Sequence, residues 1–364
     1  MREALFFTAD KVATRLKLIE PLIYRRKHLL DGFKYKALAG PGSKVNNDDF
    51  QEGGSWTRVD PFSYWGSWNQ DYVLVTDFHI PEAWPEEGSY ALYLPLGVSG
   101  DVFNHPEALA YIDDRIQGSV DRYHHELALS PHLQDGQSHQ LRLQGWTGWP
   151  AWPPDRAAKT QLFMRDCAVV EVDPPTHELH RLASAALDNI SQLQDGDPAK
   201  HALLAALDRC FKALDTRDPL PSHSFYTSVA GALHGLKQDI GQAGAPQSRK
   251  LAGIGHAHID IAYLWTVDQA RQKAGRTFAN ALRLMARNPD YRFSQSQPQL
   301  YQFLEQDFPE LNAAIDCHVA AEQWEVLSGM WVEADVNLAG GESLVRQLLL
   351  GQSYAQQRFG DKHT

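Results

Sequence analysis

The sequence predicts a multidomain α+β protein: an N-terminal β-sandwich-like domain, a helical spacer, and the first βα units of an incomplete (β/α) barrel. Three observations support this class. Short alternating apolar runs separated by Pro, Gly and Asp turns occupy residues 56–172, helical periodicity occupies 177–237, and strand and helix patterns alternate over 250–360. A chain of 364 residues is long enough for two or three such domains.

Composition argues against several classes of function. The net charge of −11 argues against nucleic acid as a partner, because phosphate binding needs a basic surface. No segment reaches the roughly 18 apolar residues of a membrane span, and the N-terminus lacks the apolar run of a signal peptide. The three cysteines lie far apart, which fits a reducing compartment. We therefore expect a cytoplasmic protein that binds neither nucleic acid nor membranes.

The first predicted segment, residues 1–50, is helical and ends in a polar loop. Helical spacing of apolar residues such as Val12 and Leu16 extends over residues 1–40, which puts the basic run Arg25-Arg26-Lys27 on a solvated helix face. The β-sandwich-like domain follows over residues 51–175, where short strands alternate with turns.

This β-rich region holds seven of the ten tryptophans. Exposed aromatic rings can stack on sugars, so a carbohydrate-binding surface is one interpretation, although core packing is the commoner role of sandwich tryptophans. The Pro-rich segment Trp146–Pro154 is expected to be a loop, and it is the best candidate for exposed aromatic rings. Residues 101–126 are rich in Asp and His; their irregular spacing favours a polar surface over a metal site.

A helical spacer and linker are predicted over residues 176–248, and a βα region over 249–364. The expected order of the βα region is strand Leu251–Asp260, helix Ala262–Asn288, strand Tyr291–Ser296, helix Pro298–Gln323 with a break at Pro309, strand Trp324–Glu333, and helix Glu342–Phe359 ending at Gly360. Such repeats imply parallel strands with right-handed crossovers. Because three βα units seldom form a complete sheet domain, this region is expected to be the opening part of a larger one.

The run His256-Ala-His258-Ile-Asp260 is the most informative feature of the chain. Alternate residues of a strand point the same way, so all three polar side chains can project from one face. Two imidazoles and a carboxylate are a plausible start to a divalent-metal site, and the carboxyl ends of parallel strands are where ligands bind. The alternative interpretation is a pair of hydrogen-bonded histidines at a strand end.

Three ordered motifs then point to a family: Gly255-His-Ala-His-Ile-Asp-Ile-Ala-Tyr-Leu-Trp, Phe293-Ser-Gln-Ser-Gln-Pro-Gln-Leu-Tyr, and Trp331-Val-Glu-Ala-Asp-Val-Asn-Leu-Ala-Gly-Gly-Glu. The chain resembles the N-terminal part of a glycoside hydrolase family 38 α-mannosidase of the cytosolic and bacterial type. The resemblance implies that residues 249–364 begin the catalytic βα domain of this family. It also implies zinc-dependent, retaining hydrolysis of terminal α-mannosides in mannose or oligosaccharide catabolism.

Carried onto this sequence, the resemblance makes His258 and Asp260 ligands of zinc, or of another divalent cation such as cobalt. His256, Glu333 and Asp335 are expected to contact the substrate or the ligand shell, with packing and hydrogen bonding as their alternative roles. Zinc suits mannose because a cation can chelate the cis 2,3-diol and favour a flattened, oxocarbenium-like ring.

The segments that carry the nucleophile, the acid/base and the last zinc histidine in this family have no match in the chain. The resemblance therefore assigns no catalytic residue here. It predicts a truncated chain that binds zinc weakly and is inactive by itself, unless a downstream polypeptide completes the barrel. The expected ligand is an α-mannoside or an oligosaccharide. Assembly of the chain into a homo-oligomer is compatible with the sequence.

Two other functions stay open. An amidohydrolase-type metal hydrolase also begins with His-x-His, but it needs further metal ligands on later strands, and only His318 and His363 follow. A metallo-β-lactamase-like enzyme is disfavoured because Ile261 stands where a histidine is required. The other alternative is a non-catalytic carbohydrate-binding fragment that uses the tryptophan-rich domain.

Overall fold

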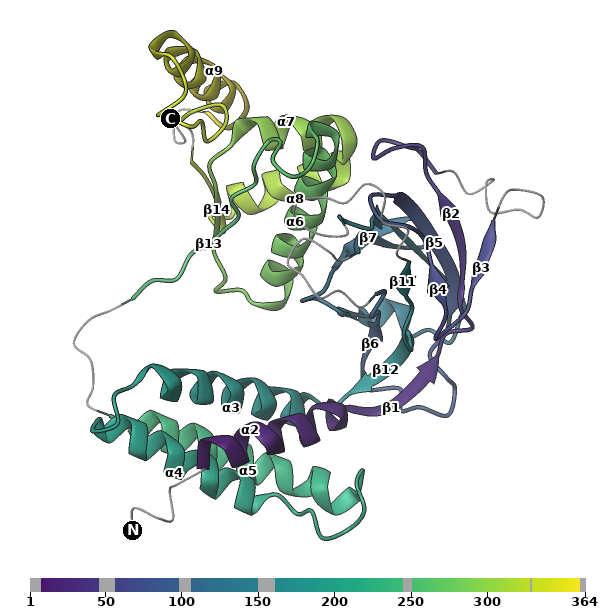
Figure 1. Ribbon diagram of the computed structural model, residues 1–364, viewed down its shortest axis with the longest axis vertical. Helices are drawn as coiled ribbons and strands as arrows, with labels where there is room; N and C mark the ends of the chain where they lie inside the picture. The colour runs from purple at the N-terminus through teal and green to yellow at the C-terminus, as the bar shows by residue number, and fades with distance from the viewer. Residues whose placement is uncertain are drawn as a thin grey trace.

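The computed structural model describes residues 8–45, 56–97, 106–149, 161–244, 251–327 and 329–360. The fold mixes helices with several sheets, as the sequence predicts (Figure 1). Among the helices of these ranges, none is long and apolar enough to cross a membrane.

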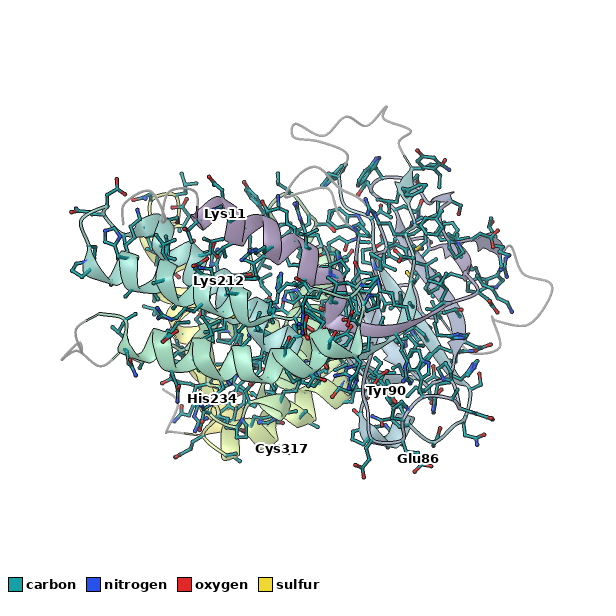
Figure 2. The ribbon with its side chains drawn as sticks, turned by 90° about the horizontal axis from the view of Figure 1, so that it is seen from below. Lys11, Glu86, Tyr90, Lys212, His234 and Cys317 are labelled. Carbon is teal, nitrogen blue, oxygen red and sulfur yellow. The ribbon has the colours of Figure 1, made fainter. Side chains whose placement is uncertain are left out.

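Four helices form a bundle: α2 (Thr8–Ile19), α3 (Pro174–Gln192), α4 (Pro198–Ala213) and α5 (His223–Gln242). They share one apolar core, to which Val12 of α2 and Phe225 of α5 both belong. Each of the last three helices begins with a side-chain cap, for example the carboxylate of Asp173, which accepts the Thr176 backbone N–H. The bundle lies beside the sheets, as Figure 2 shows with Lys11, Lys212 and His234 labelled on its helices. The N-terminal helix and the predicted spacer therefore pack as one unit.

The helix predicted for residues 1–40 ends at Ile19. A 3-10 turn, η1 (Glu20–Ile23), leads into β1 (Tyr24–Leu29) and β2 (Phe33–Ala37), as Figure 1 shows in purple. The expected helix face Arg25-Arg26-Lys27 is therefore wrong. These residues form a charged edge strand, which lacks the apolar alternation that identifies a buried strand.

Two partners hold β1 in place. Arg26 on β1 forms an ion pair across the sheet with Glu171, at 3.2 Å from its Nε. Arg25 binds the Asp173 carboxylate at the start of α3, at 2.6 Å from its Nε. The turn after β1 needs glycine at Gly32, where φ is +99° and an added Cβ would lie 2.6 Å from the Val59 carbonyl oxygen.

Two antiparallel sheets form the β-rich region. The six-stranded sheet has the order β3-β2-β5-β10-β7-β8, and the four-stranded sheet has the order β1-β12-β6-β9. The remaining bounds are β3 (Thr57–Val59), β5 (Asp71–Phe78), β6 (Ser89–Tyr93), β7 (Glu107–Ile112), β8 (Arg115–Val120), β9 (Glu126–Ala128), β10 (His139–Trp146), β12 (Ala168–Val172), the pair β4 (Tyr64–Trp65) and β11 (Leu162–Phe163), and the 3-10 turn η3 (Pro131–Leu133). Side chains from both sheets share one core, for example Leu74 and Leu143 from the larger sheet and Leu92 and Val169 from the smaller one.

Among the described residues, the tryptophans of this region are buried or half-buried. Trp146 ends β10 instead of lying in a loop, and it is 5% exposed. Trp149 is half-buried, and its indole N–H donates to the Leu264 carbonyl. The prediction that these two rings are exposed is therefore wrong, because a strand and a contact from a distant segment cover them. Trp152 of the same segment lies outside the described residues.

The βα region has the predicted order with shorter strands: β13 (Gly255–His256), α6 (Val267–Arg287), β14 (Phe293–Gln295), α7 (Pro298–Asp307), α8 (Pro309–Ala320), β15 (Trp324–Val326) and α9 (Gly341–Phe359). The strands form a parallel sheet in the order β13-β14-β15. The break at Pro309 is confirmed, and so is the end of the last helix at Gly360, whose φ is +79°. Helix α6 packs on the β-rich region, where the Asn280 side chain exchanges hydrogen bonds with Ser119.

Candidate functional site

Two buried glutamine side chains hold the carboxyl ends of the parallel strands together. The Gln295 amide donates to the Ala257 carbonyl at 3.0 Å, and the Gln297 amide donates to the Ile259 carbonyl at 2.9 Å. The Gln297 side-chain oxygen also accepts the Glu333 backbone N–H at 3.2 Å. The segment after β13 is thus fixed against the segment after β15. Neither glutamine was predicted as a site residue, although a polar side chain inside a buried strand, such as that of Gln295, is a sign of such a role.

Four of the five predicted site residues meet at this point. The His258 Nδ1 forms a hydrogen bond with a Glu333 carboxylate oxygen, and its Nε2 lies 3.2 Å from Asp260 Oδ1. The His256 Nε2 lies 3.6 Å from Glu333 Oε1. Asp335 makes a different contact: its carboxylate accepts the Asn337 backbone N–H at 2.9 Å.

Hydrogen bonds orient the other groups of the cluster. The His256 Nδ1 donates to the Ser294 carbonyl at 2.9 Å, which leaves its Nε2 facing Glu333. The Ser296 hydroxyl donates to the Glu333 carboxylate, and the Trp265 indole N–H donates to the Asp260 carbonyl at 2.9 Å. His256 therefore takes part in the cluster and is not simply a packed strand-end residue.

The cluster stabilises a positive charge on His258. The hydrogen bond with Glu333 raises the pKa of His258, and the bond with Asp260 adds to this effect. Burial opposes ionisation of Glu333, but the bonds from Ser296 and His258 outweigh it and lower the pKa of that carboxyl. Both carboxylates thus favour the protonated form of the imidazole.

The donor chemistry of His258 and Asp260 fits zinc. Bonds of about 2.0–2.1 Å at a tetrahedral angle put two ligand atoms about 3.3 Å apart, and the observed separation of Nε2 and Oδ1 is 3.2 Å. In the described ranges, however, no group of three or more His, Cys, Asp or Glu side chains is arranged to hold a metal ion. The pair of His258 and Asp260 thus has the spacing of zinc ligands, but in the described ranges no third protein ligand is arranged beside it.

The site borders a cavity of about 460 Å³ between the βα region and the β-rich region, lined by His256, His258 and Trp265 among others. Glu107 at the start of β7 accepts from Lys273 at 2.6 Å and from Arg276 at 2.8 Å. Burial lowers the pKa of Lys273, whose ammonium lies 4.4 Å from the centroid of the Trp265 indole. This ion cluster ties α6 to the larger sheet behind the site.

Two other polar groups considered in the sequence lie apart from this cluster. His318 lies on α8, and its Nδ1 is 2.8 Å from the Gln323 side-chain oxygen. Asp121 and His124 form an ion pair at 3.0 Å. His363 and residues 101–105 lie outside the described residues.

Comparison with known proteins identifies a family model that matches the βα region and relatives that match part of the chain. Residues 248–364 match the model of the glycosyl hydrolases family 38 N-terminal domain. Alpha-mannosidase G of Dictyostelium discoideum is 36% identical over 128 residues, which are 35% of this chain and 12% of that protein. Alpha-mannosidase 2C1 of Homo sapiens is 36% identical over 159 residues (42% and 15%), and the alpha-mannosidase of Saccharomyces cerevisiae is 40% identical over 111 residues (30% and 10%).

These matches confirm the resemblance inferred from the three motifs, and the chain covers only a small part of each relative. Solved structures show weak similarity. A calcium-binding mutant of Bacteroides uniformis beta-glucuronidase 2 has a TM-score of 0.27 at 12% identity, covering 41% of this chain and 18% of that one. A CBM51-2 and INT domain structure from Clostridium perfringens ZmpB has a TM-score of 0.17 at 12% identity, covering 64% and 46%. Scores this low carry no argument about fold or function.

Proposed function

We propose, from the premise that residues 248–364 are a glycoside hydrolase family 38 N-terminal domain, that the protein supplies the metal-binding part of an α-mannosidase. The activity of the complete enzyme is zinc-dependent, retaining hydrolysis of terminal α-mannosides in mannose or oligosaccharide catabolism. The single observation that carries the proposal is the pair His258 Nε2 and Asp260 Oδ1, 3.2 Å apart at the carboxyl ends of three parallel strands.

In this proposal His258 and Asp260 hold the metal, which is zinc or another divalent ion such as cobalt. Once bound, the ion supplies chelation of the mannose cis 2,3-diol and stabilisation of positive charge on the ring. His256 and Glu333 border the sugar, and Glu333 also orients His258. Asp335 lies at the same strand ends and contacts the substrate at the rim. No residue of this chain is assigned as nucleophile or acid/base.

We further propose that the parallel sheet is the start of an incomplete (β/α) barrel. Both β13 and β15 are edge strands, and a parallel sheet is normally covered on both faces. Most of the exposed large apolar side chains among the described residues lie in this region: Leu251, Ile254, Tyr263, Val267, Leu284, Leu327, Val336, Leu338, Val345, Leu348, Leu349 and Leu350. A downstream polypeptide with further βα units would cover them, and a second copy of this chain is the alternative occupant.

The isolated chain is accordingly expected to bind zinc weakly and to be inactive. Two protein ligands are fewer than the three usual in a catalytic zinc site, and the contacts of His258 with Glu333 and Asp260 raise its pKa, which opposes metal binding. The β-sandwich-like domain predicted for residues 51–175 also includes β1 and β2, and residues 249–364 are the start of the catalytic domain. The free thiols of Cys167, Cys210 and Cys317 favour a cytoplasmic location.

Calorimetric titration of zinc into the full chain tests the site. We expect binding that His258→Ala and Asp260→Asn each remove, whereas His318→Ala, a histidine on α8, leaves it unchanged. Equal zinc affinity in the wild type and in His258→Ala would overturn the assignment. Hydrolysis of 4-nitrophenyl α-mannoside tests the second part: zinc-dependent turnover by the chain alone would refute its incompleteness.

A further inference from the structure

A second cleft, of about 440 Å³, lies where η1, β1, β6, β9 and α3 meet. We call it the tyrosine cleft and define it by Tyr24, Lys27, Tyr93, Tyr123, Glu126 and His177. None of the proposed metal-site residues lines it. It includes part of the Asp- and His-rich segment that the sequence singled out and that the proposed function does not use.

Aromatic rings form the walls of the tyrosine cleft. The rings of Tyr24 and Tyr93 lie 5.3 Å apart, and the Lys27 ammonium lies 5.3 Å from the centroid of each ring. Tyr123 is 68% exposed. The described tryptophans of the β-rich region are buried or half-buried, so the exposed ring of Tyr123 is the better aromatic platform for a ligand.

Polar groups lie beside the rings. The Tyr24 hydroxyl donates to Glu126 Oε2 at 3.3 Å. Burial lowers the pKa of His177, so near neutral pH its imidazole offers one donor and one acceptor. The cleft therefore presents hydrogen-bond donors and acceptors next to apolar ring faces, in a volume within the roughly 300–1,000 Å³ of small-molecule sites.

The charges of the lining argue against ionic ligands. The carboxylates of Glu20 and Glu126 balance the cations of Lys27 and Arg122, so the cleft has no net positive charge to bind a phosphate. A quaternary ammonium would compete with the Lys27 ammonium, which already lies over two of the rings. A metal is disfavoured because no suitable group of three ligands exists among the described residues. An uncharged ring that carries hydroxyls and one apolar face fits all of these groups.

We propose that the tyrosine cleft is a non-catalytic saccharide-binding site, separate from the metal site. The sugar lies with its apolar face on the exposed ring of Tyr123, beside the Arg122 guanidinium 5.0 Å from the ring centroid, and its hydroxyls donate to Glu126. The choice of a mannose-containing oligosaccharide rests on the proposed function, whereas the saccharide class rests on the cleft. Such a site would hold one part of a glycan while another part occupies the catalytic domain.

Calorimetric titration of α-mannobiose into the full chain tests the proposal. It is done in the wild type and in His258→Ala, which removes the proposed metal ligand. We expect both to bind, and Tyr123→Ala or Glu126→Gln to weaken binding by roughly fivefold to tenfold, the loss expected for one stacked ring or one hydrogen bond. The matched control is Tyr64→Ala, because Tyr64 is 67% exposed and lies on a different sheet.

Each outcome of these titrations either supports or overturns the saccharide site. Weakening by Tyr123→Ala with an unchanged Tyr64→Ala supports the cleft, even if zinc binding fails and the proposed function with it. Loss of binding in His258→Ala, with Tyr123→Ala unaffected, would move the sugar to the metal site and overturn the proposal. Binding of choline or inorganic phosphate without binding of mannobiose would overturn the ligand class, and so would no binding of mannobiose at all.

Discussion

Removal of the Glu107 carboxylate is expected to loosen the contact between α6 and the larger sheet. Glu107 accepts hydrogen bonds from Lys273 at 2.6 Å and Arg276 at 2.8 Å. The side chains of Glu107, Lys273 and Arg276 are 13%, 18% and 7% exposed, so solvent screens both ion pairs weakly. Hydrogen bonds to charged groups contribute about 1.5–3 kcal/mol each, and removing one partner of a buried ion pair costs about 3–5 kcal/mol because the remaining charge is unpaired. We expect Glu107→Ala to lower the free energy of unfolding by about 3–5 kcal/mol.

Urea denaturation followed by tryptophan fluorescence measures this loss, since Trp146 and Trp265 both lie beside Lys273. The matched control is Glu342→Ala, which breaks the exposed pair of Glu342 with Arg346 on α9 and should cost about 0.5 kcal/mol or less. The reasoning would be refuted if both variants lost the same small amount. Such a result would mean that Lys273 and Arg276 find water or other partners without cost.

Two further predictions concern the site and the β-rich region. Gln297→Leu leaves the Ile259 carbonyl and the Glu333 backbone N–H without their side-chain partner. Zinc affinity, measured by calorimetry, should therefore fall by about tenfold or more, as it does when a residue that orients a metal ligand is removed. Gln302→Leu on α7 is the control. For His139, burial opposes the charge, but bonds to Asp113 and Asp135 outweigh it and raise its pKa, while Asp113 has a lowered pKa. His139 contributes its full stabilisation below its unfolded pKa of about 6.5, and this stabilisation is lost as pH rises through the folded pKa. Asp113 contributes stabilisation above about pH 4, and this is lost as pH falls through its lowered folded pKa. The difference in melting temperature between wild type and His139→Gln should therefore be largest between about pH 4 and 6.5, and a difference that grows towards pH 9 would contradict this.

Local sequence signals predicted the βα region well. Pro309 and Gly360 mark the helix ends in both the prediction and the structure, because proline and glycine act through the backbone of their own residues. The strand boundaries were less predictable. Leu251–Asp260 was expected to be one strand, but only Gly255–His256 pairs with β14. How far a strand extends depends on its neighbour, and that neighbour is distant in sequence.

The failures elsewhere have the same physical cause. Strand β1 consists mostly of exposed charged residues, and its conformation comes from pairing with β12, more than a hundred residues later. Trp146 was assigned to a loop from its Pro-rich neighbours, yet it pairs with Asp71 on one side and Glu107 on the other. In both cases long-range pairing overrides the local pattern, as β-structure often does.

The predicted site residues lie close together, but not for the reason expected from the sequence. We expected His256, His258 and Asp260 to share one face of a single strand, but β13 ends at His256. His258 and Asp260 lie on an irregular segment that the Gln295 and Gln297 side chains hold in place. The spacing of a motif therefore identified the donors, whereas residues about forty positions away determine their geometry.

In the proposed metal site, a proton and a metal ion would compete for His258. The carboxylates of Glu333 and Asp260 lie at opposite nitrogens of His258, so a positive charge between them is favoured whatever carries it. Zinc needs the unprotonated nitrogen, and its binding must release a proton whenever the imidazole is charged. Glu333 consequently has two opposing effects: it orients His258 for a ligand role, and it stabilises the protonated form that competes with the metal. Glu333→Gln should therefore reduce the number of protons released per zinc bound at pH 7, measured by calorimetry in buffers of different ionisation enthalpy. An unchanged proton release would show that Glu333 does not control the charge of His258.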